Sequence, residues 1–148
     1  MDGPMWNKYE PGPDKPRAAW PNEPVMRPFL KVRLRADHGK IQAVKLLVDS
    51  GSEYTLINWA FARRLNLSDE LKGAATDTVY IGGGTFPVSL VELSLVVGDF
   101  KPYKSIVGFI RYFDTTHAGV IGQRGCFDHF RVIFERPRMR FRLEQLNP

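Results

Sequence analysis

The feature that most limits how this chain can fold is an apolar run that ends in a single acidic group, Leu46-Leu47-Val48-Asp49-Ser50-Gly51-Ser52. The apolar residues predict a buried strand, and the Asp-Ser-Gly that follows predicts a tight turn at its end. A carboxylate in such a place is costly to bury unless it is hydrogen-bonded or paired. Two such carboxylates side by side would form an acid–base pair, and this chain supplies only one.

Length and composition limit the class of protein. The chain has 148 residues, which suits one domain with a sizeable core, and its composition is that of an ordinary globular protein. A formal charge of +5 permits attraction to anionic partners without requiring it. Cys126 is the one cysteine, so an intramolecular disulfide is excluded. The N-terminus lacks a signal-peptide pattern, and no apolar run approaches the ~18 residues of a membrane span. We therefore expect a cytoplasmic protein with no membrane partner.

The first 28 residues differ from the rest. They contain prolines at positions 4, 11, 13, 16, 21, 24 and 28, which fix φ and remove backbone donors, so neither a helix nor a central strand is expected. We interpret residues 1–28 as a proline-rich arm, either a flexible tail or a propeptide-like segment, and residues 29–148 as the folded domain. Trp6, Tyr9 and Trp20 favour an arm that packs on the body or on a second subunit, because a free tail seldom contains tryptophan.

From Phe29 onward the sequence is typical of β-strands. Apolar and basic residues alternate over 29–35, and residues 41–48 predict a second strand that ends at Asp49. Asn58 is a suitable N-cap for a short helix over 58–67, and residues 68–77 are expected to be a polar loop. The remaining predicted segments are a glycine-tipped hairpin over 78–91, strands at 92–97, 103–110, 119–122, 130–135 and 139–143, and a helical turn within 123–130. We therefore expect a mainly β fold, a closed β-barrel or folded sheet, with one or two short helices.

Three motifs in this order resemble the retroviral-type (retropepsin-like) aspartic proteases, especially their bacterial relatives. The first is Leu47-Val48-Asp49-Ser50-Gly51-Ser52, followed by Thr55-Leu56-Ile57. The second is the glycine-tipped hairpin at 82–84, which falls where the family carries its flap. The third is Val120-Ile121-Gly122, followed by a short helix at 124–130 and a strand. An isolated Asp-Ser-Gly is a weak signal, whereas the ordered set, from about Phe29 to Leu143, is more specific.

The resemblance implies the acid-protease fold, equivalent to one half of a pepsin-type enzyme, and a homodimer in which each chain supplies a catalytic Asp49. It also implies that the Ser50 hydroxyl reaches the partner's backbone across the two-fold axis. The other residues whose roles follow from the resemblance are Gly51 and Ser52 in the cleft, Gly82, Gly83 and Gly84 in the flap, and Glu53, Gly122 and Arg124 in the structure and the dimer. The implied substrate is a peptide or protein in extended form, with no cofactor and no metal.

Two positions depart from the family pattern. Viral members often place an arginine directly after the apolar-apolar-Gly motif, where it pairs with the acid four residues past the catalytic one. Here Gln123 follows Gly122, and the arginine comes one residue later, as Arg124, so its contact with Glu53 is an open question. Pro87 lies just past the hairpin tip, where we expect it to interrupt the strand pairing and to stiffen one arm of the flap.

The chemistry that two such carboxylates perform explains the need for a dimer. Two like charges a few ångströms apart cannot both ionise easily, so the pair shares one proton. The ionised carboxylate takes a proton from a bound water, and the protonated one donates to the carbonyl oxygen of the scissile bond. General acid–base catalysis of this kind contributes on the order of 10²–10⁴-fold. No second Asp-Ser-Gly or Asp-Thr-Gly exists in the chain, so the second acid must come from another copy.

Several alternatives stay open on the sequence alone. Asp49 could be a simple turn or cap residue, the glycine run an ordinary hairpin turn, and the whole chain a non-catalytic peptide-binding or scaffold dimer. Cys126 and His129 could form a nucleophile and base, although a buried structural cysteine is the simpler interpretation. The three histidines, His38, His117 and His129, have no metal-ligand spacing.

The C-terminal arginines have two interpretations. Arg136, Arg138, Arg140 and Arg142 alternate with other residue types, which is typical of one solvated strand face that discourages aggregation. The alternative is a basic stripe that contacts nucleic acid or an acidic substrate. We do not expect nucleic acid as a main partner.

Overall fold

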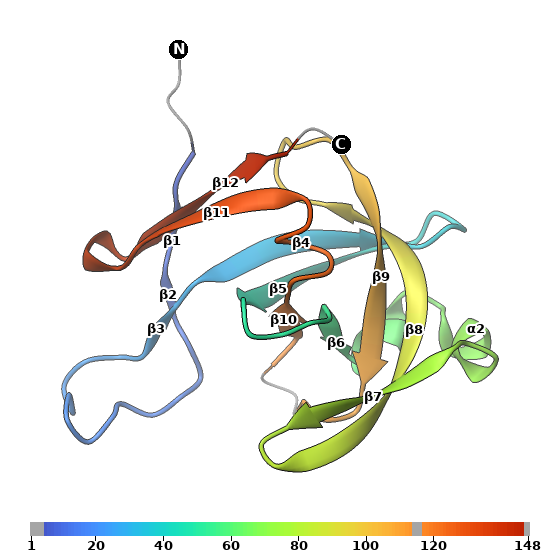
Figure 1. Ribbon diagram of the computed structural model, residues 1–148, viewed down its shortest axis with the longest axis horizontal. Helices are drawn as coiled ribbons and strands as arrows, with labels where there is room; N and C mark the ends of the chain where they lie inside the picture. The colour runs from blue at the N-terminus through green and yellow to red at the C-terminus, as the bar shows by residue number, and fades with distance from the viewer. Residues whose placement is uncertain (1–4, 114–116, 147–148) are drawn as a thin grey trace.

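The main body of the protein is one sheet that closes on itself. The computed structural model describes residues 5–113 and 117–146. Seven strands hydrogen-bond in the order β4-β5-β10-β6-β9-β8-β7, and β4 also pairs with β8, which closes the sheet into a barrel (Figure 1). The strands are β4 (Phe29–Arg35), β5 (Ile41–Val48), β6 (Leu56–Asn58), β7 (Thr76–Ile81), β8 (Gly84–Val96), β9 (Tyr103–Ile110) and β10 (Gly119–Ile121). The predicted mainly β, closed-sheet fold is confirmed.

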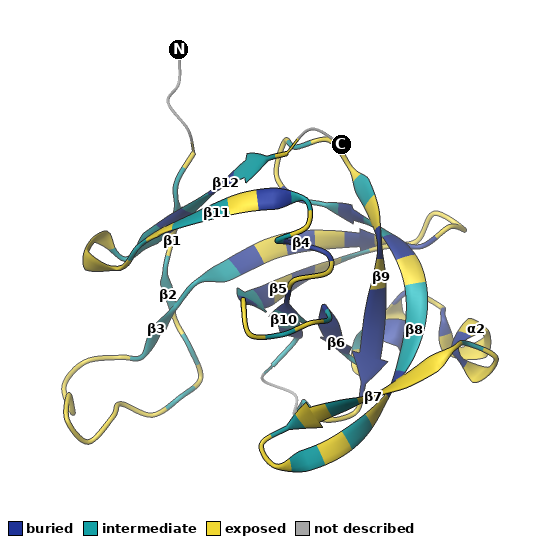
Figure 2. Ribbon diagram, viewed as in Figure 1, coloured by how far each residue is buried: buried dark blue, intermediate teal, exposed yellow. Residues whose placement is uncertain are grey.

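Alternation of side chains sets which face of each strand is buried. In β4, Leu30, Val32 and Leu34 are buried, while the basic residues between them are exposed (Figure 2). The same period of two continues in β5, where Val44, Leu46 and Val48 are buried. The largest buried side chains of the core are Phe109, Phe130, Phe141, Leu34, Leu46, Ile57, Leu65 and Leu67. Burial of this apolar interior fixes the register of β5. It therefore also fixes the position of Asp49, which directly follows Val48, the last residue of the strand.

A smaller sheet joins the C-terminus to the arm. It has the order β1-β12-β11, from β1 (Asn7–Lys8), β12 (Arg140–Gln145) and β11 (Phe130–Glu135), with a 3₁₀ turn at Arg136–Arg138. A two-stranded ladder of β2 (Glu10–Pro11) and β3 (Met26–Arg27) continues the arm. The Tyr9 ring lies 6.2 Å from that of Phe141, and the Arg140 guanidinium lies 4.0 Å from the Trp6 ring centre. Trp6 and Tyr9 of the arm therefore pack on the body, whereas Trp20 is exposed.

The helical regions differ from the sequence prediction. The helix expected over 58–67 is shorter, because α1 spans Ala60–Arg64 and Asn58 belongs to β6. Asn58 still acts at the helix start, where its Oδ1 accepts a hydrogen bond of 3.0 Å from the Ala60 N–H. The predicted polar loop over 68–77 is wrong: α2 spans Ser68–Lys72 and β7 begins at Thr76. Leu67 and Leu71, one turn apart, are both buried, and this pair holds α2 on the body.

The helix expected at Arg124 to Phe130 is reduced to a single turn at its C-terminal end. The Cys126 carbonyl accepts hydrogen bonds from the His129 N–H at 3.0 Å and from the Phe130 N–H at 2.8 Å, the second of which has the i→i+4 spacing of a helical turn. The residues before this turn are not helical: Gly122 and Gly125 form an isolated bridge, and Gly125 has φ = +107°, outside the helical range. The expected helical turn is therefore present over 126–130, and the helix does not extend back to Arg124.

Candidate active site

Asp49 begins the loop that follows the buried strand β5. Its backbone N–H donates to the Ile121 carbonyl at 3.0 Å, which fixes the start of the loop against β10. The carboxylate then caps the turn, because Oδ1 accepts a hydrogen bond of 2.9 Å from the Gly51 N–H. Oδ2 accepts no hydrogen bond from any described residue. The side chain is half-buried, so one carboxylate oxygen is held and the other is available to a partner.

Strand β10 passes between the two strands that carry this loop. It runs parallel to β5, with Ile121 opposite Val48, and antiparallel to β6, with Val120 opposite Leu56. This close passage requires glycine at its end. A Cβ on Gly122 would lie 2.3 Å from the Ser52 carbonyl oxygen, a distance that no side chain tolerates. The predicted Val120-Ile121-Gly122 motif therefore lies directly against the Asp49 loop.

Backbone hydrogen bonds then connect the two segments beyond Gly122. The Gln123 N–H donates to the Ser52 carbonyl at 2.8 Å, and the Arg124 N–H donates to the Glu53 carbonyl at 2.9 Å. These bonds place the Arg124 side chain beside Glu53, and its Nε donates to Glu53 Oε1 at 3.0 Å. The contact that the sequence left open is thus present. Both side chains are about two-thirds exposed (67% for Glu53 and 65% for Arg124), so the pair contributes little stability in one chain.

Thr55 is a support that sequence reasoning did not assign. Its side chain is fully buried, and its hydroxyl accepts from the Gly122 N–H at 3.2 Å and donates to the Arg124 carbonyl at 2.7 Å. A buried hydroxyl with both capacities used is a rigid connector. The available signal was a hydroxyl residue placed directly before the apolar pair Leu56 and Ile57.

The glycine hairpin faces the Asp49 loop across a groove. Gly82 and Gly83 have φ of +57° and +82°, and Ile81 pairs with Gly84, so the tip is a two-residue turn of the type I′ class. The open groove beneath it has a volume of about 670 Å³. The side chains and backbone that line it come from the Asp49 loop, from β7 and from four further positions, Leu56, Gly82, Phe113 and Val120. The full lining is Asp49, Gly51, Ser52, Glu53, Tyr54, Leu56, Asp77, Thr78, Val79, Tyr80, Ile81, Gly82, Phe113 and Val120. Asp49 and the hairpin therefore share one groove.

Comparison with known families decides the class of the protein. A sequence profile described as aspartyl protease matches residues 32–124, more than half of the chain. The chain belongs to the aspartyl protease family. The matched span contains the Asp49 loop, the hairpin and Gly122, and the resemblance to retropepsin-like proteases is confirmed. No curated protein matches the chain. Family membership supports a protease, and hence a hydrolase.

Pro87 of this protease domain does not interrupt the hairpin, so that expectation is wrong. The β7–β8 register runs through Thr78 opposite Pro87 without a break. Ile81 and Gly84 form the hydrogen-bonded pair at the turn, and pairs alternate along an antiparallel ladder, so Pro87 occupies a non-hydrogen-bonded position. On its other side the β8–β9 pairing starts only at Ser89. Neither β7 nor β9 therefore requires a hydrogen bond from the N–H that Pro87 lacks.

Aromatic side chains support the hairpin from the loop after β9. The rings of Phe86 and Tyr112 lie 4.8 Å apart, and those of Tyr112 and Phe113 lie 5.5 Å apart, both edge to face. A Cβ built on Gly82 would lie 3.8 Å from the Tyr112 hydroxyl oxygen. The hairpin of the protease domain thus has a packed position above the groove rather than a free one.

A hydrogen bond that the sequence did not predict joins the Asp49 loop to the hairpin base. The Tyr54 hydroxyl donates to Asp77 Oδ2 at 2.6 Å, and the Thr78 N–H donates to Oδ1 at 2.7 Å. These two donors lower the pKa of the Asp77 carboxyl from its ordinary value. The same hydrogen bond raises the pKa of Tyr54. The contact spans 23 residues of sequence, and no local motif signals it.

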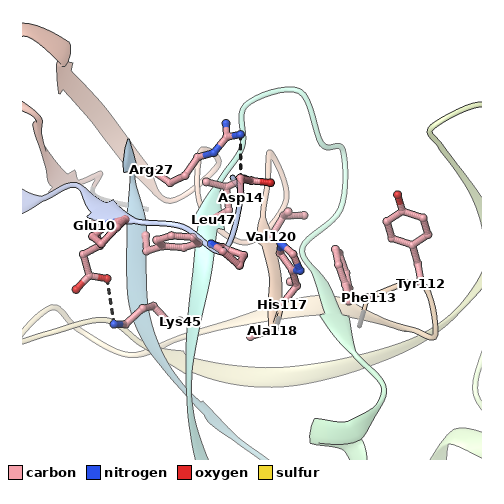
Figure 3. A pocket seen from close by; sticks show the side chains of 14 residues that line it. Glu10, Asp14, Arg27, Lys45, Leu47, Tyr112, Phe113, His117, Ala118 and Val120 are labelled. Atoms are coloured by element: carbon pink, nitrogen blue, oxygen red, sulfur yellow. Dashed lines mark hydrogen bonds and ion pairs between the residues drawn. The ribbon is translucent and has the colours of Figure 1, made fainter. Parts of the chain in front are cut away.

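A second cavity, of about 820 Å³, adjoins the groove and shares Phe113 and Val120 with it (Figure 3). One wall comes from the arm, at residues 10–14, and the floor comes from the strands that carry Asp49. Two ion pairs hold this wall: Glu10 Oε2 with Lys45 Nζ at 3.0 Å, and Asp14 Oδ2 with Arg27 Nη2 at 3.3 Å. The arm therefore shapes the surroundings of the protease groove.

The remaining candidate chemistry lies away from the groove. Cys126 is buried, and burial, with a smaller effect of the nearby Asp128 carboxylate, raises the pKa of its thiol to about 12, which opposes a nucleophilic role. His129 stacks on Tyr103, with ring centres 4.2 Å apart.

Within residues 5–113 and 117–146, no three His, Cys, Asp or Glu side chains gather as metal ligands. In the same part of the chain, no helix is long and apolar enough to cross a membrane.

Proposed function

We propose that the protein is an aspartic endopeptidase that acts as a homodimer, with one Asp49 from each subunit at the two-fold axis. The observation that carries the proposal is the unpaired Oδ2 of Asp49, held by a rigid loop at the edge of a groove that the hairpin overlooks. One chain offers one such acid, and peptide hydrolysis by this chemistry needs two. A second copy supplies the other acid and completes the cleft.

In the proposed mechanism, the two Asp49 side chains share one proton. The ionised one removes a proton from a water held between them, and that water attacks the scissile carbonyl carbon. The protonated one donates its proton to the carbonyl oxygen, and the tetrahedral intermediate then collapses as the leaving nitrogen takes up a proton. Ser50, Gly51 and Ser52 form the turn that positions the acid, and the hairpin glycines 82–84 close over the bound peptide.

The proposed substrate is a peptide in extended form. It would pair with the hairpin as an added strand, and its side chains would enter the groove. Leu56, Val79, Ile81, Phe113 and Val120 supply an apolar lining, which favours apolar residues next to the cleaved bond. The negative charge of Asp49 and the ion pair of Glu53 with Arg124 lie at the edge toward the second subunit. We also propose a cytoplasmic location and a role of residues 1–28 as an arm of the domain at 29–148.

Replacement of the proposed catalytic acid is the first experiment. Asp49→Asn should lower kcat on a quenched-fluorescence peptide with an apolar cleavage site by about 10²-fold or more, because it removes the general acid–base pair. Dimer mass, measured by sedimentation, should stay the same. Asp99→Asn, in an exposed turn, is the matched control and should keep full activity. Undiminished cleavage by Asp49→Asn would contradict the assignment.

Binding of pepstatin separates an enzyme from a non-catalytic peptide-binding dimer of the same fold. Pepstatin mimics the tetrahedral intermediate, so it should bind the wild type tightly and the Asp49→Asn variant weakly. A dimer that binds extended peptides, does not bind pepstatin and cleaves no substrate would favour the binding module. A protein that stays monomeric at all concentrations would exclude both.

A further inference from the structure

The exposed face of β4 carries a row of cations. Lys31, Arg33 and Arg35 all point outward, because they alternate with the buried leucines and valine of the same strand. No ion pair involves any of the three within the part of the chain that the structure describes. Side chains two apart on a strand are about 6.6 Å apart, so the row is a closely spaced line of positive charge.

Neighbouring strands extend this positive charge. Lys45 of β5 lies directly opposite Lys31, and like charges in that position repel and destabilise a sheet. Glu10 of the arm offsets part of that repulsion through its 3.0 Å contact with Lys45. A shallow groove of about 570 Å³ between the arm and the sheet is lined by Lys8, Lys31 and Lys45. We call Lys8, Lys31, Arg33, Arg35 and Lys45 the basic face; among residues 5–113 and 117–146, Glu10 is the acid that forms an ion pair with it.

The C-terminal arginines, in contrast, already have partners. Glu135 Oε2 binds Arg140 at 2.7 Å and Arg138 at 3.1 Å. Glu144 binds Arg131 at 3.2 Å and Arg142 at 3.1 Å. Trp6 of the arm also lies against Arg140 and Arg142. The stripe that the sequence offered for nucleic-acid contact is therefore largely neutralised and covered, although Arg136 has no ion pair among the described residues. Strand β4 carries three cations without ion pairs in a single row.

The backbone of the basic face limits the class of partner. From Arg33 to Arg35, β4 is paired with β5 on one side and with β8 on the other, so a peptide cannot add a strand there. Along this stretch a partner is recognised through the charged side chains rather than through the backbone. Phosphate groups along a flexible strand meet that requirement, because their binding depends on Lys and Arg and needs neither an apolar pocket nor a free sheet edge.

We propose that the basic face binds the phosphate backbone of a single-stranded nucleic acid without reading its sequence. The site is independent of Asp49, which lies at the end of β5 next to the groove. Binding at this face would bring the protease to polyanionic assemblies, where proteins bound to the same nucleic acid are nearby. Affinity should fall with salt, with a slope of about −0.7 per phosphate contacted.

The test uses a short, labelled single-stranded RNA of mixed sequence and fluorescence anisotropy across a salt series. The variant K31E/R33E/R35E removes the row, and R63E/K72E/K101E is the matched control, since it changes the net charge equally at exposed cations of α1, α2 and the turn after β8. We expect the first variant to lose about tenfold or more in affinity and to have a salt slope shallower by about 2, while the control stays close to wild type. Thermal unfolding checks that both variants fold, and K31Q/R33Q/R35Q replaces the first variant if charge reversal unfolds it.

Several results would overturn the proposal. Wild-type protein that does not bind the RNA at low salt has no such site. An equal loss in both variants means that net charge alone attracts the RNA. An affinity for the RNA that does not change with salt concentration would exclude binding through phosphate groups. Wild-type protein that binds vesicles rich in phosphatidylserine and not the RNA would assign the basic face to anionic lipid instead.

Discussion

At the scale of single residues, the hydrogen bond of Tyr54 to Asp77 makes a pH-dependent contribution to stability. The pKa of Asp77 is lowered in the folded protein, chiefly by the Tyr54 hydroxyl, so the unfolded chain binds more protons at acid pH. The stabilisation is complete above the ordinary value of 3.8 and is lost as the pH falls through the folded pKa. Tyr54→Phe should therefore make the loss of stability between about pH 5 and about pH 2 shallower, as measured by urea midpoints.

Tyr80→Phe is the control for this experiment. Tyr80 lies on the same hairpin as Asp77, is 81% exposed and has no hydrogen-bonded partner among the described residues. It should keep the wild-type pH profile. If Tyr54→Phe also keeps that profile, the hydrogen bond to Asp77 does not persist in solution. A downward shift of the midpoint that is equal at every pH would mean that only packing was lost.

Local motifs made part of the site predictable at this scale. The positions of Asp49 at the end of β5 and of Gly122 against the Asp49 loop followed from short sequence patterns, because each is set by neighbours within one turn or by a close backbone approach. The contact of Glu53 with Arg124 was left open by the sequence, because the arginine is displaced by one residue. The motif included Thr55 but did not indicate the partners of its buried hydroxyl, and the Tyr54–Asp77 bond was not predictable. Both join segments far apart in the sequence, and polar residues give no periodic signal of their partners.

At the scale of elements, the two glycines at the hairpin tip are not equivalent. Type I′ turns accept asparagine at the first central position and strongly prefer glycine at the second. Gly83, with φ = +82°, should therefore tolerate no side chain, and Gly83→Ala should destabilise the hairpin by about 1 kcal/mol. Gly82→Asn should be close to neutral. Hydrogen exchange of the paired amides in β7 and β8 measures the difference, with faster exchange expected only for Gly83→Ala.

Equal exchange rates in the two variants would mean that the tip does not hold the turn geometry described above. The same variants probe the proposed function, because a loosened hairpin should raise KM for a peptide more than it lowers kcat. Amides of β4 and β5, which lie outside the hairpin, serve as the internal reference and should exchange as in the wild type.

Strands were more predictable than turns and helices. The bounds of β4 and β5 follow from strict alternation between buried and exposed residues, which the closed sheet enforces. The missed α2 depends on one buried pair, Leu67 and Leu71, inside a stretch that is otherwise polar. The helix expected from Arg124 formed only as one turn at 126–130, because hydrogen bonds to the loop at 52–55 hold the backbone of Gln123 and Arg124. Tertiary contacts override weak local preference in both places.

At the scale of the whole molecule, the arm has contacts with the region that the family match covers. The family match begins at residue 32, so the arm lies outside it. The arm nevertheless contributes a strand to the β1-β12-β11 sheet and a wall to the cavity beside the groove. Its backbone also reaches β5, the strand that leads to Asp49, since the Pro28 carbonyl accepts a hydrogen bond of 3.0 Å from the Val48 N–H.

Removal of residues 1–24 tests what the arm does, because this deletion keeps the Pro28 contact that positions Val48. The cavity would lose the wall at residues 10–14, so an extended peptide should bind more weakly, with KM raised severalfold and kcat changed little. Trp20→Ala, at a position that is 61% exposed and outside that wall, is the control and should leave KM unchanged. Unfolding by urea and sedimentation show whether the shortened protein stays folded and dimeric. A folded, dimeric deletion variant with wild-type KM and kcat would show that the arm takes no part in substrate binding.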